Sequence, residues 1–505
     1  MSKTLEEFEQ YLDKMKKYEH INTLLYWDMK TCAPKLGQAG HIDALTYFST
    51  ESFAMSTSDE LYGMLEKLKK PEEFEQLSDK MKFIVTRMQR DMEKDRRIPK
   101  DRYEVMVREQ AESGNAWEDA KNASDFSIFA PHLEKMIALT REMAGYTDPG
   151  KEVYDVLLDK YEEGMDSATI DRLFGELKEA LIPLVKKILA AKQPDDAKFH
   201  AYFDPDDQRK VQDLLLSYIG FSKDAGSVGE TEHPFTLNFS SKDVRVTNHY
   251  YEHDPISAMF SAIHEGGHAI FEQNVNPEYD NTVAGSCHYM GVHESQSRFY
   301  ENILGRNKNF WIPVYGKVQE LMPQMKEISL DEFYHEINHV RNSLIRTEAD
   351  EVTYCFHIIL RYEMEKAIFR DNVPVENLPE LWNQKMKEYL DITPANDAEG
   401  ILQDMHWSDG SFGYFPSYLL GSIYDGMYLE ELEKELGPVD EILKEGRIKE
   451  ITKWLNKKIH WYGSTRTPKE VIANVCGKEV SAEPLVRYFE KKYADIYNLD
   501  HLMEK

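Results

Sequence analysis

The sequence predicts a mainly α-helical protein with one small β-sheet. From Met1 to about Lys192, and again after Asp254, apolar residues recur every three or four positions, which is the period of amphipathic helices. One stretch that starts at His233 alternates apolar and polar residues instead, which is the period of a strand. The chain of 505 residues shows no fixed-period repeat, so a solenoid is not expected.

The N-terminal helices each carry a single apolar stripe, so each needs a packing partner. A stretch rich in proline and aspartate, residues 193–210, interrupts them and predicts a linker. We therefore expect one domain, residues 1–505, made of an N-terminal helical half (1–192) and a second half (211–505). The two clearest stripes are Leu5, Phe8, Leu12, Met15, Tyr18, Ile21 and Leu25, and Ile170, Leu173, Leu177, Leu181, Leu184 and Ile188.

The strand-like stretch predicts a β-hairpin that leads into a helix. Residues 235–239 and 243–247 alternate apolar with polar side chains, and Ser240, Ser241 and Lys242 between them suit a turn. Asp254 then suits a helix N-cap and Pro255 the first helical position. The expected apolar face of this helix is Ile256, Met259, Phe260, Ile263, Gly267 and Ile270.

Composition excludes several classes of protein. The formal net charge of −29 would repel nucleic acid and anionic membranes, so neither is an expected partner. No signal-like segment and no apolar run of about eighteen residues is present, and we expect a cytoplasmic protein. The cysteines form no CxxC pair, which predicts buried free thiols; they are Cys32, Cys287, Cys355 and Cys476.

The sequence HEGGH, residues 264–268, predicts a metal site on the helix that follows the hairpin. His264 and His268 are four residues apart and share a helical face, so both imidazoles can reach one ion, with Glu265 beside it. The alternative is a pair of histidines satisfied by core hydrogen bonds. Two adjacent glycines lower helix propensity, and we expect them to allow a close backbone approach.

A catalytic zinc site needs a third protein ligand, and Glu294 is the candidate. It opens a helical pattern that ends at Gly305, after a loop expected to contain Asn281, Gly285 and Gly291. Glu301 lies seven residues later on the same face and suits a partner of a ligating histidine, or else a solvated carboxylate. With Glu265 as proton carrier, this set predicts metal-assisted amide hydrolysis.

Two arginines are candidates for holding a substrate. In DVRVT, the strand period puts Asp243, Arg245 and Thr247 on one face, where Arg245 could bond a peptide carbonyl or carboxylate; an exposed hairpin face is the alternative. In IRTEAD, Arg346 and Asp350 are spaced i,i+4, which on its own is typical of a surface ion pair on a helix.

A third region, residues 400–421, is expected to form a loop that lines the binding site. A phenol or imidazole from this loop could donate to the oxyanion of a tetrahedral intermediate, and the sequence does not choose among the candidates. An aromatic cluster in the core is the alternative. The side chains concerned are Gln403, Asp404, His406, Trp407, Tyr414 and Tyr418.

These segments together resemble the thermostable carboxypeptidase 1 family, metallopeptidase family thirty-two. The likeness extends from LLYWDMKTCAP near Trp27 and Asp28 across essentially the whole chain. The matching motifs, in order, are HPF (233–235), DxRxT (243–247), HExxH (264–268), HESQ (293–296), IRxxAD (345–350) and GxxQDxHW (400–407).

The resemblance implies a helical, gluzincin-type fold with a deep active-site groove, and a homodimer that removes C-terminal amino acids with broad preference. It implies His264, His268 and Glu294 as ligands of one Zn²⁺ ion per chain, with Co²⁺ or Mn²⁺ as alternatives, and Glu265 as the catalytic carboxylate.

By the same resemblance, Arg346 becomes the leading candidate for gripping the substrate's terminal carboxylate, with Arg245 second. Other expected substrate contacts are His233, His406, Tyr414 and Tyr418, supported by Asp243, Thr247, Asp350, Gln403 and Asp404. The rival functions are an endo-acting zinc oligopeptidase and a non-catalytic peptide-binding metalloprotein.

Overall fold

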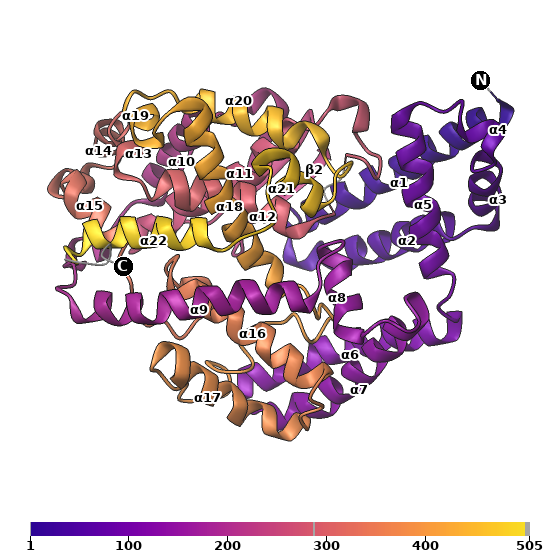
Figure 1. Ribbon diagram of the computed structural model, residues 1–505, viewed down its shortest axis with the longest axis horizontal. Helices are drawn as coiled ribbons and strands as arrows, with labels where there is room; N and C mark the ends of the chain where they lie inside the picture. The colour runs from indigo at the N-terminus through magenta and orange to yellow at the C-terminus, as the bar shows by residue number, and fades with distance from the viewer. Residues whose placement is uncertain (1, 286–287, 500–505) are drawn as a thin grey trace.

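The computed structural model describes residues 2–285 and 288–499, and it is mainly helical, as predicted (Figure 1). Within these residues no helix combines the length and the apolar character that crossing a membrane requires. The helices before the sheet are α1 (Lys3–Thr31), α2 (Gln38–Ser56), α3 (Asp59–Leu68), α4 (Pro71–Phe74), α5 (Asp79–Asp95), α6 (Lys100–Ala123), α7 (Phe126–Thr147), α8 (Val153–Tyr161), α9 (Ser167–Ala190) and α10 (Pro205–Ile219).

The helices after the sheet include those that carry most of the predicted site. They are α11 (Pro255–Gln273), α12 (Met290–Arg298), α13 (Lys308–Trp311), α14 (Tyr315–Leu321), α15 (Leu330–Ile337), α16 (Thr353–Phe369), α17 (Leu378–Leu390), α18 (Phe415–Leu436), α19 (Val439–Lys444), α20 (Ile448–Lys458), α21 (Pro468–Cys476) and α22 (Glu483–Ile496). A π-helical turn, η5 (Phe299–Gly305), extends α12 directly.

Aspartate caps followed by proline set the start of two helices. Asp254 accepts a hydrogen bond from the Ser257 amide and Pro255 occupies the first turn of α11, which confirms the predicted cap. Asp204 caps α10 in the same way, ahead of Pro205. The predicted linker, residues 193–210, was therefore too long, because helix resumes at its thirteenth residue.

The small sheet contains β1 (Gly226–Glu230), β2 (Thr236–Ser240) and β3 (Asp243–Asn248), in the order β1-β3-β2. Antiparallel pairing of β2 with β3 confirms the predicted hairpin. Strand β1 pairs in parallel with β3 and was not predicted. Its sequence, GSVGE, holds two glycines and a single apolar residue, so it lacks the alternation that marks a strand.

Among the described residues, two separate groups of buried side chains stabilise the fold. The larger core takes residues from Ala120 to Tyr497, so it draws on both sides of the linker. It includes the whole predicted stripe of α9, where each side chain is at most 2% exposed. The smaller core lies among α1, α3 and α5 and contains Phe8, Leu61, Met64, Leu65, Leu68, Leu77, Met81, Ile84, Val85, Met92 and Ala284.

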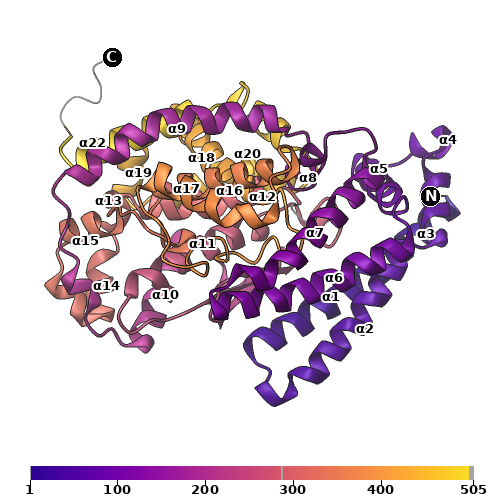
Figure 2. The same ribbon diagram turned by 90° about the horizontal axis from the view of Figure 1, so that it is seen from below.

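Helix α1 buries much less of its predicted stripe than α9 does. Of that stripe only Phe8 is fully buried, because α1 and α2 pair as a hairpin that projects from the rest of the molecule (Figure 2). Leu24, Ile42 and Tyr47 on this hairpin are between 44% and 61% exposed. The helix itself was predicted correctly. Its apolar period could not show that α1 packs mainly against a single helix, α2, which leaves much of the stripe partly exposed.

The described cysteines are free, as predicted, but they are not all buried. Cys355 is buried, Cys476 is partly buried and Cys32 is exposed at the end of α1, so the expectation of burial was wrong for Cys32. The remaining cysteine, Cys287, lies outside the described residues.

The small core predicts a local loss of stability. Leu65→Ala removes a fully buried side chain and should cost about 2–5 kcal/mol, felt mainly by α1, α3 and α5. Hydrogen-exchange mass spectrometry should show faster exchange in those helices and little change in α16. The matched control is Leu360→Ala in the large core, which should accelerate exchange in α16 instead. Equal acceleration of both regions by Leu65→Ala would contradict two separable cores.

Candidate metal centre

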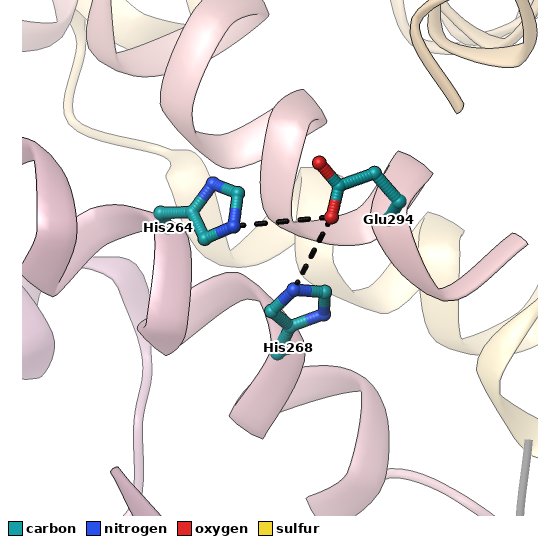
Figure 3. Close-up of side chains that lie close together, drawn as sticks. All are labelled: His264, His268 and Glu294. Carbon is teal, nitrogen blue, oxygen red and sulfur yellow. Dashed lines mark ion pairs between the residues drawn. The ribbon is translucent and has the colours of Figure 1, made fainter. Parts of the chain in front are cut away.

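Helices α11 and α12 bring the predicted ligand set together (Figure 3). The Nε2 atoms of His264 and His268 lie 3.9 Å and 3.5 Å from one oxygen of Glu294, Oε2. Helix α12 begins at Met290, so Gly291 lies in its first turn. The expectation that Gly291 belongs to the preceding loop was wrong. Glu294 consequently sits one turn into the helix, on the side that faces α11.

The geometry of these atoms fits a divalent ion such as zinc. Ligand atoms about 2.0–2.2 Å from a tetrahedral zinc lie roughly 3.3 Å apart, close to the separations observed here. The other nitrogen of each ring is engaged elsewhere, which turns Nε2 toward Glu294. The second carboxylate oxygen, Oε1, accepts a hydrogen bond from Arg298 at 2.6 Å. Two imidazoles and one carboxylate thus converge, which is a donor set used by catalytic zinc sites.

Each histidine is oriented by a partner behind it. Glu301, in η5, is hydrogen-bonded through Oε2 to His264 Nδ1 at 2.8 Å, so the predicted contact of Glu301 with one of the two histidines is confirmed. His293 Nδ1 is hydrogen-bonded to His268 Nδ1 at 2.6 Å, and His293 Nε2 is hydrogen-bonded to Glu272 at 2.8 Å. Sequence reasoning missed the pair of His293 and Glu272, although Glu272 lies four residues after His268 and so shares its face.

Burial and neighbouring charges set the protonation of these groups in the metal-free chain. Burial and His293 lower the pKa of His268 to about 3. Burial also lowers the pKa of His264, but Glu301 and Glu294 outweigh it and raise the value to about 9, so an ion would displace a proton there. For Glu294, burial opposes ionisation but Arg298 and His268 hold its pKa well below the usual range.

Glu265 lies beside the ligands and is only 7% exposed. The Thr236 hydroxyl, from β2, donates to its Oε2 at 2.5 Å and fixes the carboxylate against the sheet. Burial raises the pKa of Glu265 above that of an ordinary glutamate, which suits a group that takes up and releases a proton.

The two glycines of HEGGH face different neighbours. A Cβ on Gly267 would lie 2.7 Å from the Gln296 carbonyl oxygen and 2.8 Å from Ser297 Cα, which are backbone atoms of α12. A Cβ on Gly266 would meet only the ends of the Ile219 and Leu216 side chains, at 2.5 Å and 2.9 Å. Gly267 therefore allows the approach of the two ligand-bearing helices, as the sequence led us to expect.

Arg346 is buried, and its expected pairing with Asp350 was wrong. A 3₁₀ turn, Arg346–Glu348, ends before α16, so the two residues do not share a helix. Asp350 instead accepts the amides of Val352 and Thr353, the N-cap and first residue of α16, each at 3.0 Å. Arg346 is 8% exposed and donates to Asp404 at 2.8 Å and 3.0 Å.

Asp404 is shared between two guanidinium groups. Arg361, which is fully buried, donates to its other oxygen at 2.6 Å. Gln403 accepts a bond from Arg361 at 3.0 Å and donates to the Leu344 carbonyl at 2.9 Å, which fixes the segment leading to Arg346. Gln403 also accepts the backbone amide of Arg346 at 3.3 Å, so the two residues expected to support substrate binding, Gln403 and Asp404, both contact Arg346 directly.

The aromatic region is only partly the loop that the sequence predicted. Tyr418 lies on α18 and not in a loop, and Trp407 is buried and donates to Glu365 at 3.0 Å. His406, Tyr414 and Tyr418 do cluster, with His406 Nε2 3.3 Å from the Tyr418 hydroxyl and the two tyrosine rings 5.1 Å apart. Burial and the charge of Glu294 raise the pKa of Tyr414, and its ring packs edge-on against Tyr161, with the ring centres 5.0 Å apart.

Arg245 is held among aromatic rings on the hairpin. Asp243 accepts from it at 2.8 Å and 2.9 Å, as expected, and its guanidinium lies 4.2 Å from the centre of the Phe239 ring. Thr247 is fully buried and donates to the Phe235 carbonyl, so it supports the sheet. His233 is exposed between β1 and β2.

Two further groups of metal-ligating side chains occur among the described residues. Each already has a cation beside its carboxylates. Arg341 bridges Asp196 and Glu336 at 2.9 Å to each, and Lys135 lies 3.6 Å from Glu109. The set of His264, His268 and Glu294 is the one whose nitrogen atoms face a shared carboxylate oxygen. The two further groups are Asp196, Glu336 and His339, and Glu109, Glu112 and His132.

The chain matches a family of known proteins. The model of the carboxypeptidase Taq (M32) metallopeptidases matches residues 7–493. Carboxypeptidase 1 of Bacillus subtilis is 42% identical over 98% of both chains, and thermostable carboxypeptidase 1 of Thermus thermophilus is 36% identical over 94% of this chain and 96% of its own.

Solved structures agree with the same assignment. An M32 carboxypeptidase from Deinococcus radiodurans superimposes with a TM-score of 0.95 at 28% identity, covering 98% of this chain and 100% of its own. A Pyrococcus furiosus carboxypeptidase superimposes with a TM-score of 0.93 at 32% identity, covering 98% and 99%.

The contact at Gly267 predicts unequal effects of two neighbouring substitutions. Gly267→Ala should destabilise the protein by about 1–3 kcal/mol or more, because its methyl group meets backbone that cannot move independently. Gly266→Ala is the matched control and should cost less, because side-chain ends can shift and alanine gains about 1 kcal/mol of helix propensity. Urea unfolding measures both. Equal stability of the two variants would remove the special role of Gly267.

Proposed function

The chain belongs to the carboxypeptidase Taq (M32) metallopeptidase family, and on that premise we propose that it removes C-terminal amino acids from peptides of varied sequence with zinc as its metal. It is a metallocarboxypeptidase, a peptide-bond hydrolase. The observation that carries the proposal is the convergence of His264, His268 and Glu294 beside a buried Glu265. Co²⁺ and Mn²⁺ are the alternative ions.

The chain's own groups suit the steps of amide hydrolysis. A zinc ion held by His264, His268 and Glu294 would supply Lewis acidity to the scissile carbonyl and to a water molecule. Glu265 would take a proton from the water as its oxygen bonds to the carbonyl carbon, and would deliver that proton to the nitrogen as the C–N bond breaks. Thr236 keeps the carboxylate in place through its hydroxyl bond, and the raised pKa of Glu265 favours this transfer in both directions.

Three groups of the aromatic cluster, Tyr414, Tyr418 and His406, are candidates for stabilising the developing oxyanion. Tyr414 and Tyr418 stay protonated, because burial raises the pKa of each phenol, so both can donate. Burial lowers the pKa of His406 to about 4, so this imidazole is neutral and donates only through whichever nitrogen carries hydrogen.

Arg346 is the proposed clamp for the terminal carboxylate of the substrate. Its guanidinium lies 5.1 Å from the centre of the Tyr418 ring, and one of its nitrogens donates to the Tyr354 hydroxyl at 3.2 Å. The Arg298 guanidinium lies 4.0 Å from the centre of the Tyr354 ring and bonds Glu294. This chain of contacts connects Arg346 with the ligand set. Arg245 remains the second candidate.

Broad preference, a homodimer and a cytoplasmic location complete the proposal. The first two follow from the family resemblance of the sequence motifs. The exposed apolar side chains of the α1–α2 hairpin offer a surface for a second copy of the chain.

The rival functions account for fewer of these features. An endo-acting oligopeptidase would need no terminal clamp, and a non-catalytic peptide-binding protein would gain nothing from Glu265 beside its ion.

Replacement of the proposed proton carrier separates catalysis from metal binding. Glu265→Gln should keep metal content nearly unchanged, because Glu265 is not a ligand, and should remove turnover. Metal analysis and peptide digestion followed by mass spectrometry measure the two quantities on one sample. Full turnover in this variant would refute the proton-transfer role, and loss of metal from it would make Glu265 a ligand.

The clamp predicts a preference for free C-termini. The wild-type chain should shorten a free-acid peptide residue by residue and leave its C-terminal amide intact. Arg346→Ala should lose on the order of 2–5 kcal/mol of transition-state stabilisation on the free acid, because a desolvated carboxylate is left unpaired. Arg245→Ala is the matched control, with a smaller loss. Internal cleavage of both peptides would favour the oligopeptidase.

A further inference from the structure

The helix that delivers Glu294 is capped from a distant part of the chain. The N-cap residue of α12 is Tyr289, whose phenol turns away and donates to Glu163 at 3.1 Å. The amide of Gly291, in the first turn, donates to a carboxylate oxygen of Glu162, which lies 129 residues earlier. First-turn amides of a helix need such acceptors, and a carboxylate also suits the positive end of the helix dipole.

The carboxylate of Glu162 is buried and is held by a second hydrogen bond. It is 1% exposed, and the Tyr424 hydroxyl, from α18, donates to its second oxygen at 3.3 Å. Burial raises the pKa of Glu162 to about 7, against the hydrogen bonds that favour the charged form. A Cβ on Gly291 would lie 2.6 Å from the nearer oxygen of Glu162, so any other residue there would force this buried carboxylate to shift.

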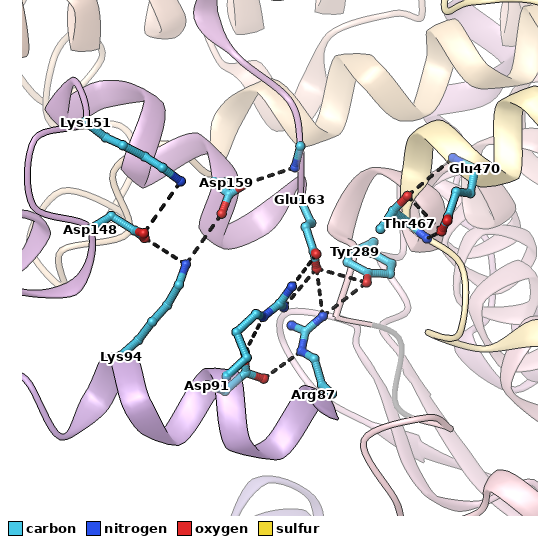
Figure 4. Close-up of polar contacts among 12 residues, drawn as sticks. Arg87, Asp91, Lys94, Asp148, Lys151, Asp159, Glu163, Tyr289, Thr467 and Glu470 are labelled. Carbon is cyan, nitrogen blue, oxygen red and sulfur yellow. Dashed lines mark hydrogen bonds and ion pairs between the residues drawn. The ribbon is translucent and has the colours of Figure 1, made fainter. Parts of the chain in front are cut away.

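The next residue ties the same turn to the N-terminal helices (Figure 4). Glu163 accepts hydrogen bonds from Arg87 at 2.8 Å and from Arg90 at 3.0 Å, both on α5. Arg87 also donates to the Tyr289 hydroxyl at 3.1 Å. Adjacent glutamates after α8 therefore hold Tyr289 and Gly291, which stand on either side of the first residue of α12.

We propose that Glu162 is a positioning residue for the metal centre: its carboxylate fixes the first turn of α12 and thereby the placement of Glu294, one turn further on. The role rests on the proposed function, since it presumes that Glu294 binds the ion. Glu162 acts through the Gly291 amide and through α12, and it needs no contact with metal or substrate.

Gly291→Ala gives the sharpest test, because helix propensity alone predicts the opposite result. Alanine is the better helix former, so a glycine without a special contact would tolerate or benefit from the change. Here the new methyl group displaces the Glu162 carboxylate, and we expect zinc affinity to fall by about 10-fold or more, as for other groups that orient ligands. The matched control is Gly316→Ala, at the second residue of α14, where a Cβ meets nothing within 4 Å.

Substitution of Glu162 itself should follow the acceptor and not the size of the side chain. Glu162→Leu removes the acceptor and should weaken zinc binding about as much as Gly291→Ala. Glu162→Gln keeps an oxygen for the Gly291 amide and should restore most of the affinity. The dissociation constant is measured on the full chain by competition with a zinc chelator, with hydrogen exchange of α12 and thermal unfolding recorded on the same samples.

The outcomes distinguish this inference from the proposed function. Wild-type affinity in both Gly291→Ala and Glu162→Leu would overturn the role of Glu162 while leaving the metal centre intact. If the wild-type chain binds no zinc, or His268→Ala binds as well as wild type, the proposed function fails first. Should Glu162→Leu not fold, the comparison of Gly291→Ala with Gly316→Ala decides alone.

Discussion

The close approach of α11 to α12 is the constraint on which the proposed metal centre depends. Gly267 brings α11 against the backbone of α12 at Gln296 and Ser297, two and three residues beyond Glu294. From α18, Gly421 reaches the same helix, where a Cβ would lie 3.0 Å from the Ser295 amide nitrogen. Distances between ligand atoms are therefore set by contacts of backbone with backbone, which tolerate little change.

This packing places several ionisable groups largely out of contact with solvent, and their pairing with opposite charges offsets the cost of that burial. Glu301 joins His264 to Arg306, and Glu294 contacts Arg298 as well as the two histidines. Burial opposes the charge of Glu301, yet His264 and Arg306 lower its pKa to about 2. A buried charge without such partners would shift toward its neutral form, and the ligand set would lose its negative member.

Local spacing made the central part of the site predictable. His264, His268 and Glu265 follow from the geometry of one helix, as does the Asp254 cap, and Glu301 follows from its position two turns after Glu294. These inferences need no knowledge of which segments meet. The hairpin of β2 and β3 was predictable for the same reason, because its partners are adjacent in the chain.

Contacts between distant segments were not predictable in this way. Asp404, the partner of Arg346, lies 58 residues away, whereas Asp350 at the favourable i,i+4 spacing accepts the first amide of α16. Strand β1 joins the sheet through a parallel partner, so neither its glycine-rich sequence nor a turn revealed it. The hydrogen bond from the Gly291 amide to Glu162 likewise depends on tertiary packing, and the helix propensities of the residues around Gly291 do not predict it.

The arrangement of Arg346, Arg361 and Asp404 shows why tertiary partners matter for recognition. Asp404 neutralises one of the two guanidinium groups, and both arginines keep its pKa well below the usual range. Arg361 is fully buried, whereas Arg346 is 8% exposed, so Arg346 is the arginine through which the remaining positive charge can act on a ligand. In a chain whose net charge is −29, a fixed local excess of one positive charge favours a small anion over the surrounding potential. A carboxylate that approaches Arg346 would supply the second negative charge that Arg346, Arg361 and Asp404 lack. An uncharged amide of the same shape would leave one guanidinium without a counter-charge.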